Sequence, residues 1–162
     1  MSETLKTQTK PRWSLEMYLR KVFKVVIDPL AAFLLKIGVT PNMVTGIGFI
    51  LSSVSAFILS RGNFTLGGLI LLIAAPLDVV DGSMARLIGT PTPYGSLIDS
   101  VTDRYSELVV FGGLLFFFVG AQNSLGIILV FLAAAGSVLV SYVKARAEAL
   151  GLNCRMGVLT RV

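Results

Sequence analysis

Four long apolar segments dominate this sequence, and their lengths restrict the chain to folds that can sit in a lipid bilayer. They run from Pro41 to Ser60, from Phe64 to about Leu87, from about Tyr94 to Gly120 and from about Leu125 to Val143. About 20 apolar residues are enough for an α-helix to cross the hydrocarbon core. A hydrophobic fraction of 54% and a mean hydropathy of +0.82 also exclude an ordinary soluble domain. We therefore expect an all-α, polytopic transmembrane helix bundle with four spans.

Local start and stop signals separate these segments. Thr40-Pro41-Asn42 is a helix start, because Thr can cap a helix and Pro is tolerated in its first turn. Arg61–Asn63 and Ala121–Ser124 are short polar turns. The fourth segment is expected to continue as helix through Lys144–Leu150, until Gly151 ends it.

The residues before the first span are expected to form two shorter helices. Residues Pro11–Lys24 mix apolar side chains with basic ones at helical spacing and include Trp13. This pattern predicts an amphipathic helix on the membrane surface, although a helix that packs on a partner protein remains an alternative. Asp28-Pro29 is expected to break the chain, and Leu30–Ile37 to form a short apolar helix that Gly38 ends.

Four carboxylates interrupt the apolar pattern at the junction of the second and third spans. They are Asp78, Asp81, Asp99 and Asp103. An ionised side chain costs roughly 2.5–3.5 kcal/mol at the centre of a membrane helix, so four together need a partner that offsets their charge. Ion pairs are the simplest alternative, but Arg86 and Arg104 cannot neutralise four carboxylates. A divalent cation is the partner that the pattern favours.

Helical periodicity places these carboxylates on two faces. Asp78, Asp81, Gly82, Ala85 and Arg86 share one arc of about 140°, whereas Val79, Val80 and Met84 point elsewhere. Gly95, Asp99, Thr102, Asp103 and Ser106 share a face of the next segment. If the linker Leu87–Tyr94 reverses the chain, the two faces meet. Carboxylate oxygens suit magnesium or manganese better than zinc, and the chain has no histidine and one cysteine.

At these residues the chain resembles the CDP-alcohol phosphotransferase family. That family's signature reads D-x-x-D-G-x-x-A-R, eight residues, G-x-x-x-D-x-x-x-D, and every specified position is matched between Asp78 and Asp103. The resemblance implies a membrane enzyme that moves a phosphatidyl-type group from a CDP-linked lipid, such as CDP-diacylglycerol, to an alcohol and releases CMP. Such enzymes usually have six transmembrane helices. We therefore expect a transmembrane domain over residues 39–162 that lacks the last two, preceded by a juxtamembrane region over residues 1–38.

The resemblance also implies a role for each matched residue. Asp78, Asp81 and Asp99 would bind metal, and Asp103 would be a further ligand and the general base that deprotonates the acceptor hydroxyl. The cytidine-diphosphate pocket would be formed by Gly82, Ala85, Arg86 and Gly95. Two Mg²⁺ or Mn²⁺ ions would neutralise charge on the pyrophosphate.

The alcohol acceptor is indicated less directly. Ser141–Gly151 resembles a stretch of bacterial phosphatidylinositol phosphate synthases, which use inositol phosphate. A phosphorylated acceptor needs basic partners, and Lys144, Arg155 and Arg161 are the candidates. The alternative for these residues is the ordinary basic flank of a membrane span. Glycerol phosphate is the second candidate acceptor, as in phosphatidylglycerophosphate synthase.

Two other functional classes fit less well. Membrane prenyltransferases also bind diphosphate through aspartate-rich motifs, but those motifs normally lie about a hundred residues apart. A divalent-cation transporter should carry acidic groups across the whole depth of the bilayer, whereas here they gather at one side. The spacing of the motif favours the phosphatidyltransferase.

The distribution of basic residues predicts the orientation in the membrane. With the N-terminus inside, 13 of the 14 Lys and Arg residues lie at the inner side and only Arg61 lies outside. We expect a multi-pass protein of the cell membrane, with both termini and the acidic site facing the cytoplasm. The basic residues flank apolar segments, so the net charge of +5 indicates a lipid bilayer as partner and no nucleic acid. The oligomeric state stays open, a homodimer included.

Overall fold

A computed structural model describes residues 27–89 and 92–152, and all regular structure within these ranges is helical. The helices are α2 (Pro41–Ser60), α3 (Phe64–Ile88), α4 (Pro93–Gly120) and α5 (Ser124–Ala149), and residues 27–36 form a shorter helix before them. The four predicted segments are therefore confirmed as helices, with nearly the predicted ends. The predicted amphipathic helix over residues 11–24 lies outside the described residues.

Side-chain caps fix where the four long helices begin. In each case a Thr or Asn side-chain oxygen accepts a hydrogen bond from the backbone N–H three residues later. The pairs are Thr40 with Met43, Asn63 with Leu66, Thr92 with Gly95 and Asn123 with Gly126, at 3.4, 3.1, 3.0 and 2.9 Å. Such a bond satisfies one of the N–H groups that a helix start leaves unpaired.

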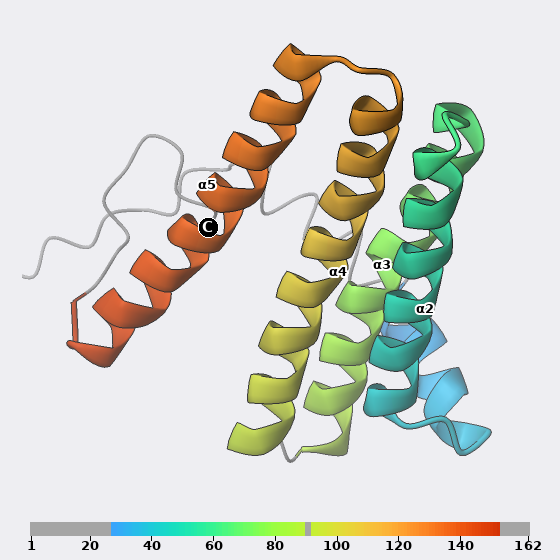
Figure 1. Cartoon of the computed structure of the whole chain (residues 1–162). Helices are drawn as coiled ribbons and strands as arrows, with labels where there is room; N and C mark the ends of the chain where they lie inside the picture. Colours follow the sequence, from blue (N-terminus) through green and yellow to red (C-terminus); the bar gives the residue numbers. More distant parts are fainter. Residues whose placement is uncertain (1–26, 90–91, 153–162) are drawn as a thin grey trace, which may run out of the picture.

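Helix α2 packs along both α3 and α4 (Figure 1). Small residues permit the close approach: the Ser55 hydroxyl donates to the Gly67 carbonyl at 2.8 Å, and Gly113 lies against the Ala56 backbone with no room for a side chain. Among the described residues, α3 and α4 bring no Cα atoms within 8 Å of each other. These two helices therefore face each other through side chains alone.

Helix α5 is arranged differently. It packs only on α4 and leans away from it toward the Ala149 end (Figure 1). Most of its apolar side chains are exposed, for example Phe131 at 65% and Val140 at 71%. Within the described part of the chain, α5 is the long helix with the least protein around it.

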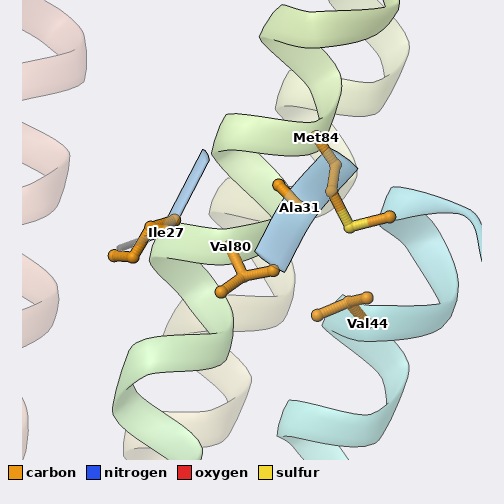
Figure 2. Packing of buried hydrophobic residues seen from close by; sticks show 5 residues of the cluster. All are labelled: Ile27, Ala31, Val44, Val80 and Met84. Atoms are coloured by element: carbon orange, nitrogen blue, oxygen red, sulfur yellow. The ribbon is translucent and has the colours of Figure 1, made fainter. Parts of the chain in front are cut away.

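The short helix over residues 27–36 packs at the end of the bundle where α2 begins and α3 ends (Figure 1). Its Ile27 and Ala31 join Val44, Val80 and Met84 in a buried apolar cluster (Figure 2). We call this end of the bundle, where α4 also begins, the motif end. The cluster packs the motif-bearing part of α3 against the short helix and the start of α2.

One expectation for this region was wrong. Asp28 and Pro29 do not break the chain, because both lie within the helical residues 27–36. The Asp28 carboxylate accepts a hydrogen bond from the Ser83 hydroxyl at 2.5 Å, which ties the short helix to α3. The predicted stop at Gly38 is confirmed: its φ is +83° and its N–H bonds to the Leu35 carbonyl at 3.1 Å.

Three of the long helices, α2, α3 and α5, are long and apolar enough to cross a membrane. Helix α4 has 28 residues, but charged side chains gather in its first half at Asp99, Asp103, Arg104 and Glu107. Its second half is apolar from Leu108 to Val119. That α4 is the fourth span therefore stays a prediction.

Candidate functional site

Three carboxylates from two helices meet at the motif end. Asp78 near the end of α3 and Asp99 and Asp103 near the start of α4 each offer an oxygen, and these oxygens lie within 4.8 Å of one another. The spacing of four residues puts Asp99 and Asp103 one above the other on α4. We call these three residues the acidic trio. The two acidic faces thus meet as expected, across the space between α3 and α4.

Asp81 lies beside the trio but is held separately. It is 3% exposed, and one of its carboxylate oxygens accepts a hydrogen bond from the Thr45 hydroxyl of α2 at 2.5 Å. Its other oxygen and one oxygen of Asp99 are buried without any hydrogen-bond partner. Buried polar atoms are nearly always paired, so two orphaned carboxylate oxygens at one site indicate that a ligand belongs there.

A hard divalent cation fits this arrangement. Opposite oxygens around Mg²⁺ lie about 4 Å apart, since each Mg–O bond is about 2 Å, so a spread of up to 4.8 Å needs only small side-chain rotations. The negative charge of three carboxylates exceeds the positive charge of one divalent cation. A second cation would offset the remaining charge. Oxygen-only ligands favour Mg²⁺ or Mn²⁺ over softer metals.

The residues expected to bind the nucleotide lie in the last two turns of α3 and the first turn of α4. Arg86 is exposed, and a Cβ atom on Gly82 would meet nothing except the Arg86 guanidinium at 3.8 Å. Ala85 is half-buried on the same face. Gly95 lies in the first turn of α4, where its N–H is used by the Thr92 cap. Space therefore exists at Gly82 and Ala85, whereas the Gly95 amide is already occupied.

A cavity of about 710 Å³ opens from the acidic residues into the bundle. Its polar end includes Asp78, Asp81 and Asp103, and Val79, which was expected to point elsewhere, also lines it. The remaining lining residues are Val44, Thr45, Gly48, Phe49, Ser52, Leu71, Ala74, Ala75, Thr102, Arg104, Ser106, Glu107, Val110, Phe111 and Ser137. The predicted placement of Thr102, Asp103 and Ser106 on one face of α4 agrees with this lining.

Three polar residues of the cavity that sequence reasoning did not assign to the site form one hydrogen-bonded cluster. The Arg104 guanidinium donates to the Glu107 carboxylate at 2.7 Å, and the Ser137 hydroxyl of α5 donates to the same carboxylate oxygen. We call Arg104, Glu107 and Ser137 the Arg104 cluster. The sequence feature that could have revealed this cluster was Glu107, because it continues the four-residue spacing of Asp99 and Asp103 toward the apolar part of α4.

The basic residues expected to bind the acceptor are not brought to the acidic trio by the described structure. Lys144 is exposed and does not line the cavity. It lies in the part of α5 that leans away from α4 (Figure 1). Arg155 and Arg161 lie outside the described residues.

The chain matches a family model. The model describes the CDP-alcohol phosphatidyltransferase family and covers residues 38–157. This range includes every residue of the acidic trio, Asp81 and Thr45.

Among relatives, a phosphatidylinositol phosphate synthase of Streptomyces avermitilis is 37% identical over 149 residues, which are 90% of this chain and 61% of the relative. Two solved structures of the Mycobacterium tuberculosis phosphatidylinositol phosphate synthase, one with CDP-DAG bound and one in complex with manganese and citrate, match with TM-scores of 0.75 and 33% identity. Both matches cover 84% of this chain, and 69% and 66% of the two solved chains. The chain thus spans less than two thirds of the Streptomyces relative's length.

Proposed function

This chain belongs to the CDP-alcohol phosphatidyltransferase family, and we propose that it transfers a phosphatidyl group from CDP-diacylglycerol to a phosphorylated alcohol, releasing CMP. The observation that carries this proposal is the acidic trio together with the buried, unpartnered carboxylate oxygens of Asp99 and the neighbouring Asp81. A site for divalent cations beside an amphipathic cavity suits a substrate with a charged diphosphate at one end and a lipid at the other.

Asp78, Asp99 and Asp103 would hold Mg²⁺ or Mn²⁺, with the unpartnered oxygen of Asp81 as a further ligand. When bound, the metal supplies positive charge that stabilises the pyrophosphate and the departing CMP. Thr45 keeps the Asp81 carboxylate in place through its hydroxyl. The manganese in the related Mycobacterium structure supports this choice of ion.

Asp103 has a second task in the proposed reaction. An acceptor hydroxyl must lose its proton as it attacks the phosphorus that carries the diacylglycerol, and a carboxylate is the base available in a chain without histidine. Asp103 lines the cavity at its polar end, where an acceptor entering from the motif end would meet it. Arg86, exposed beside the open space at Gly82, is placed to pair with a phosphate of the cytidine diphosphate.

Inositol phosphate is the acceptor that we favour. The relatives named phosphatidylinositol phosphate synthase and the Ser141–Gly151 stretch support it. Lys144 would bind the acceptor phosphate, which requires the Lys144 end of α5 to lie closer to α4 than it does here. Glycerol phosphate remains the competing acceptor.

We further propose that the protein lies in the cell membrane with the motif end facing the cytoplasm. The excess of Lys and Arg on that side supports this orientation, and CDP-linked donors are made in the cytoplasm.

The test is an acceptor panel with one donor. The full-length protein, purified in maltoside micelles, receives CDP-dioleoylglycerol, Mn²⁺ and either inositol phosphate, glycerol 3-phosphate or unphosphorylated inositol, and CMP release is followed. We expect release with inositol phosphate and none after chelation of the metal. Equal release with inositol would remove the phosphorylated acceptor from the proposal, and no release with any alcohol would overturn the transferase itself.

A further inference from the structure

The lining of the cavity changes from acidic to apolar along α4, in the direction away from the motif end. Asp99, Asp103, Glu107 and Phe111 follow one another at intervals of four residues, so they form one row along the helix. Each step of four residues advances about 6 Å along the helix axis. One turn deeper than the last metal-binding carboxylate lies Glu107, to which Arg104 and Ser137 donate hydrogen bonds, and one turn deeper again lies Phe111.

The facing helices leave room at the level of the Arg104 cluster. The cavity is lined there by Gly48 of α2 and by Ala74 and Ala75 of α3. A Cβ atom on Gly48 would have no neighbour closer than 3.9 Å, so the space is open. Deeper still, Leu71 and Val110 make the walls apolar.

Arg104 is held in this space and not buried in the protein. Its side chain is 35% exposed and that of Glu107 is 40% exposed, although both lie near the middle of α4. Glu107 takes one of the donor groups of the guanidinium, and Ser137 fixes Glu107 from α5. A guanidinium has five N–H donors, so several remain for another acceptor inside the cavity.

We propose that Arg104, oriented by Glu107 and Ser137, binds the ester carbonyl oxygens of the diacylglycerol part of the lipid donor, and that the deeper apolar end receives the start of an acyl chain. This inference rests on the proposed function, because it places the diphosphate at the acidic trio. The ester carbonyls of a CDP-linked diacylglycerol lie a few bonds from its phosphorus, which is about the reach of one helical turn. Glu107, to which the Arg104 guanidinium bonds at 2.7 Å, lies one turn deeper than Asp103.

A purely structural role would be different. If the Arg104 cluster only fastened α5 to α4, through the hydrogen bond from Ser137 to Glu107, its loss would affect stability but not the choice of donor. The proposed role distinguishes an ester-linked donor from an ether-linked one, because an ether has no carbonyl oxygen for Arg104 to bind. Donor selectivity is therefore the quantity to measure.

The experiment measures three affinities for the full-length protein in maltoside micelles with Mn²⁺, where no bilayer lipid competes for the cavity. The ligands are CDP, CDP-dioleoylglycerol and a diether analogue of that lipid. For Arg104→Gln we expect the affinity for the diester donor to fall about tenfold to a hundredfold, as for a lost charge-assisted hydrogen bond. CDP affinity should not change, and the preference for diester over diether should disappear.

Two further variants make the outcome decisive. Ser137→Ala should lower the affinity for the diester donor about two- to tenfold through the freed Glu107, with CDP affinity again unchanged. Arg61→Gln is the control, because Arg61 lies at the opposite end of the bundle over the Phe57 ring. The proposal is overturned if Arg104→Gln leaves the diester preference intact, or if it lowers CDP affinity as much as lipid affinity. If the unaltered protein bound no CDP with Mn²⁺, the proposed function itself would fail, which is a separate result.

Discussion

Helices α2, α3 and α4 form a packed unit, whereas α5 touches only one of them. Inside the packed unit, glycine and serine residues bring backbones together, as at Gly113 against Ala56 and Ser55 with Gly67. On α5, large apolar side chains such as Phe131 and Val140 are exposed. Contacts within the described chain therefore determine how α2, α3 and α4 lie against one another. The position of α5 depends on its contacts with α4 alone among these helices.

The two regions also carry different parts of the proposed reaction. Every residue that we assign to the metal and to the nucleotide lies on α2, α3 or α4, and the acidic trio is assembled there. The candidate acceptor residue Lys144 is on α5. In the proposed reaction, the residues assigned to the donor are thus brought together by the described helices, whereas the residue assigned to the acceptor is not.

The largest expected effect is the loss of catalysis when the trio loses one charge. Asp78→Asn and Asp99→Asn should each reduce transfer more than about a hundredfold, because a neutral amide replaces a charged oxygen ligand. CMP release from CDP-diacylglycerol measures this. Glu148→Gln, an exposed carboxylate on α5, is the matched control and should retain activity. Near-normal activity of either trio variant would remove the metal site from the mechanism.

The next largest effect tests the close packing of α4 on α2. Gly113→Ala should lower the free energy of unfolding by about 2–3 kcal/mol, because its Cβ would overlap the Ala56 backbone and push α4 away from α2. Gly112→Ala is the control, since a Cβ there meets nothing within 4 Å. Unfolding in mixed micelles compares the two. Equal stability of both variants would mean that α2 and α4 are not in contact at this point.

A smaller effect is expected where α2 supports the acidic residues. Thr45→Val should lower the free energy of unfolding in the absence of metal by about 1–2 kcal/mol, because it leaves the buried Asp81 carboxylate without its donor. Thr45→Ser keeps the hydroxyl and should restore most of the loss. Thermal unfolding of the metal-free protein is the measurement, and no benefit from Ser over Val would argue against the hydrogen bond.

The smallest effect should come from α5. Lys144→Ala should raise the KM for inositol phosphate about tenfold, as expected for one charge-assisted contact, with unchanged affinity for the donor. Because Lys144 is exposed, unfolding should change by less than about 0.5 kcal/mol. Steady-state kinetics with varied acceptor provide the test. An unchanged KM would assign Lys144 to the basic flank of a membrane span.

The helices were predictable from the sequence because hydrophobic length and cap residues determine them locally. Thr40, Asn63 and Asn123 cap helices that begin within a residue of the predicted starts. The error at Asp28-Pro29 arose because Ser83, 55 positions along the chain, supplies a hydrogen-bond partner for Asp28 that the local sequence does not reveal.

The candidate site was predictable only in part. Motif spacing placed Asp78, Asp99 and Asp103 together, but the bond from Thr45 to Asp81 joins residues 36 positions apart and depends on how α2 lies against α3. Ser137 likewise reaches Glu107 across two helices. Helical periodicity predicts which residues share a face of one helix, but it does not predict which residues of two helices come into contact.

The affinity of the protein for Mn²⁺ is the most direct test of a metal site at the acidic trio. Electron paramagnetic resonance of the purified full-length protein would compare the unaltered chain with Asp99→Asn and with Asp28→Asn. Asparagine can still accept the Ser83 hydrogen bond at position 28, so that variant is matched in chemistry and place. We predict that Asp99→Asn weakens Mn²⁺ binding at least about tenfold and that Asp28→Asn changes it less than about twofold. Equal affinities in all three proteins would contradict it.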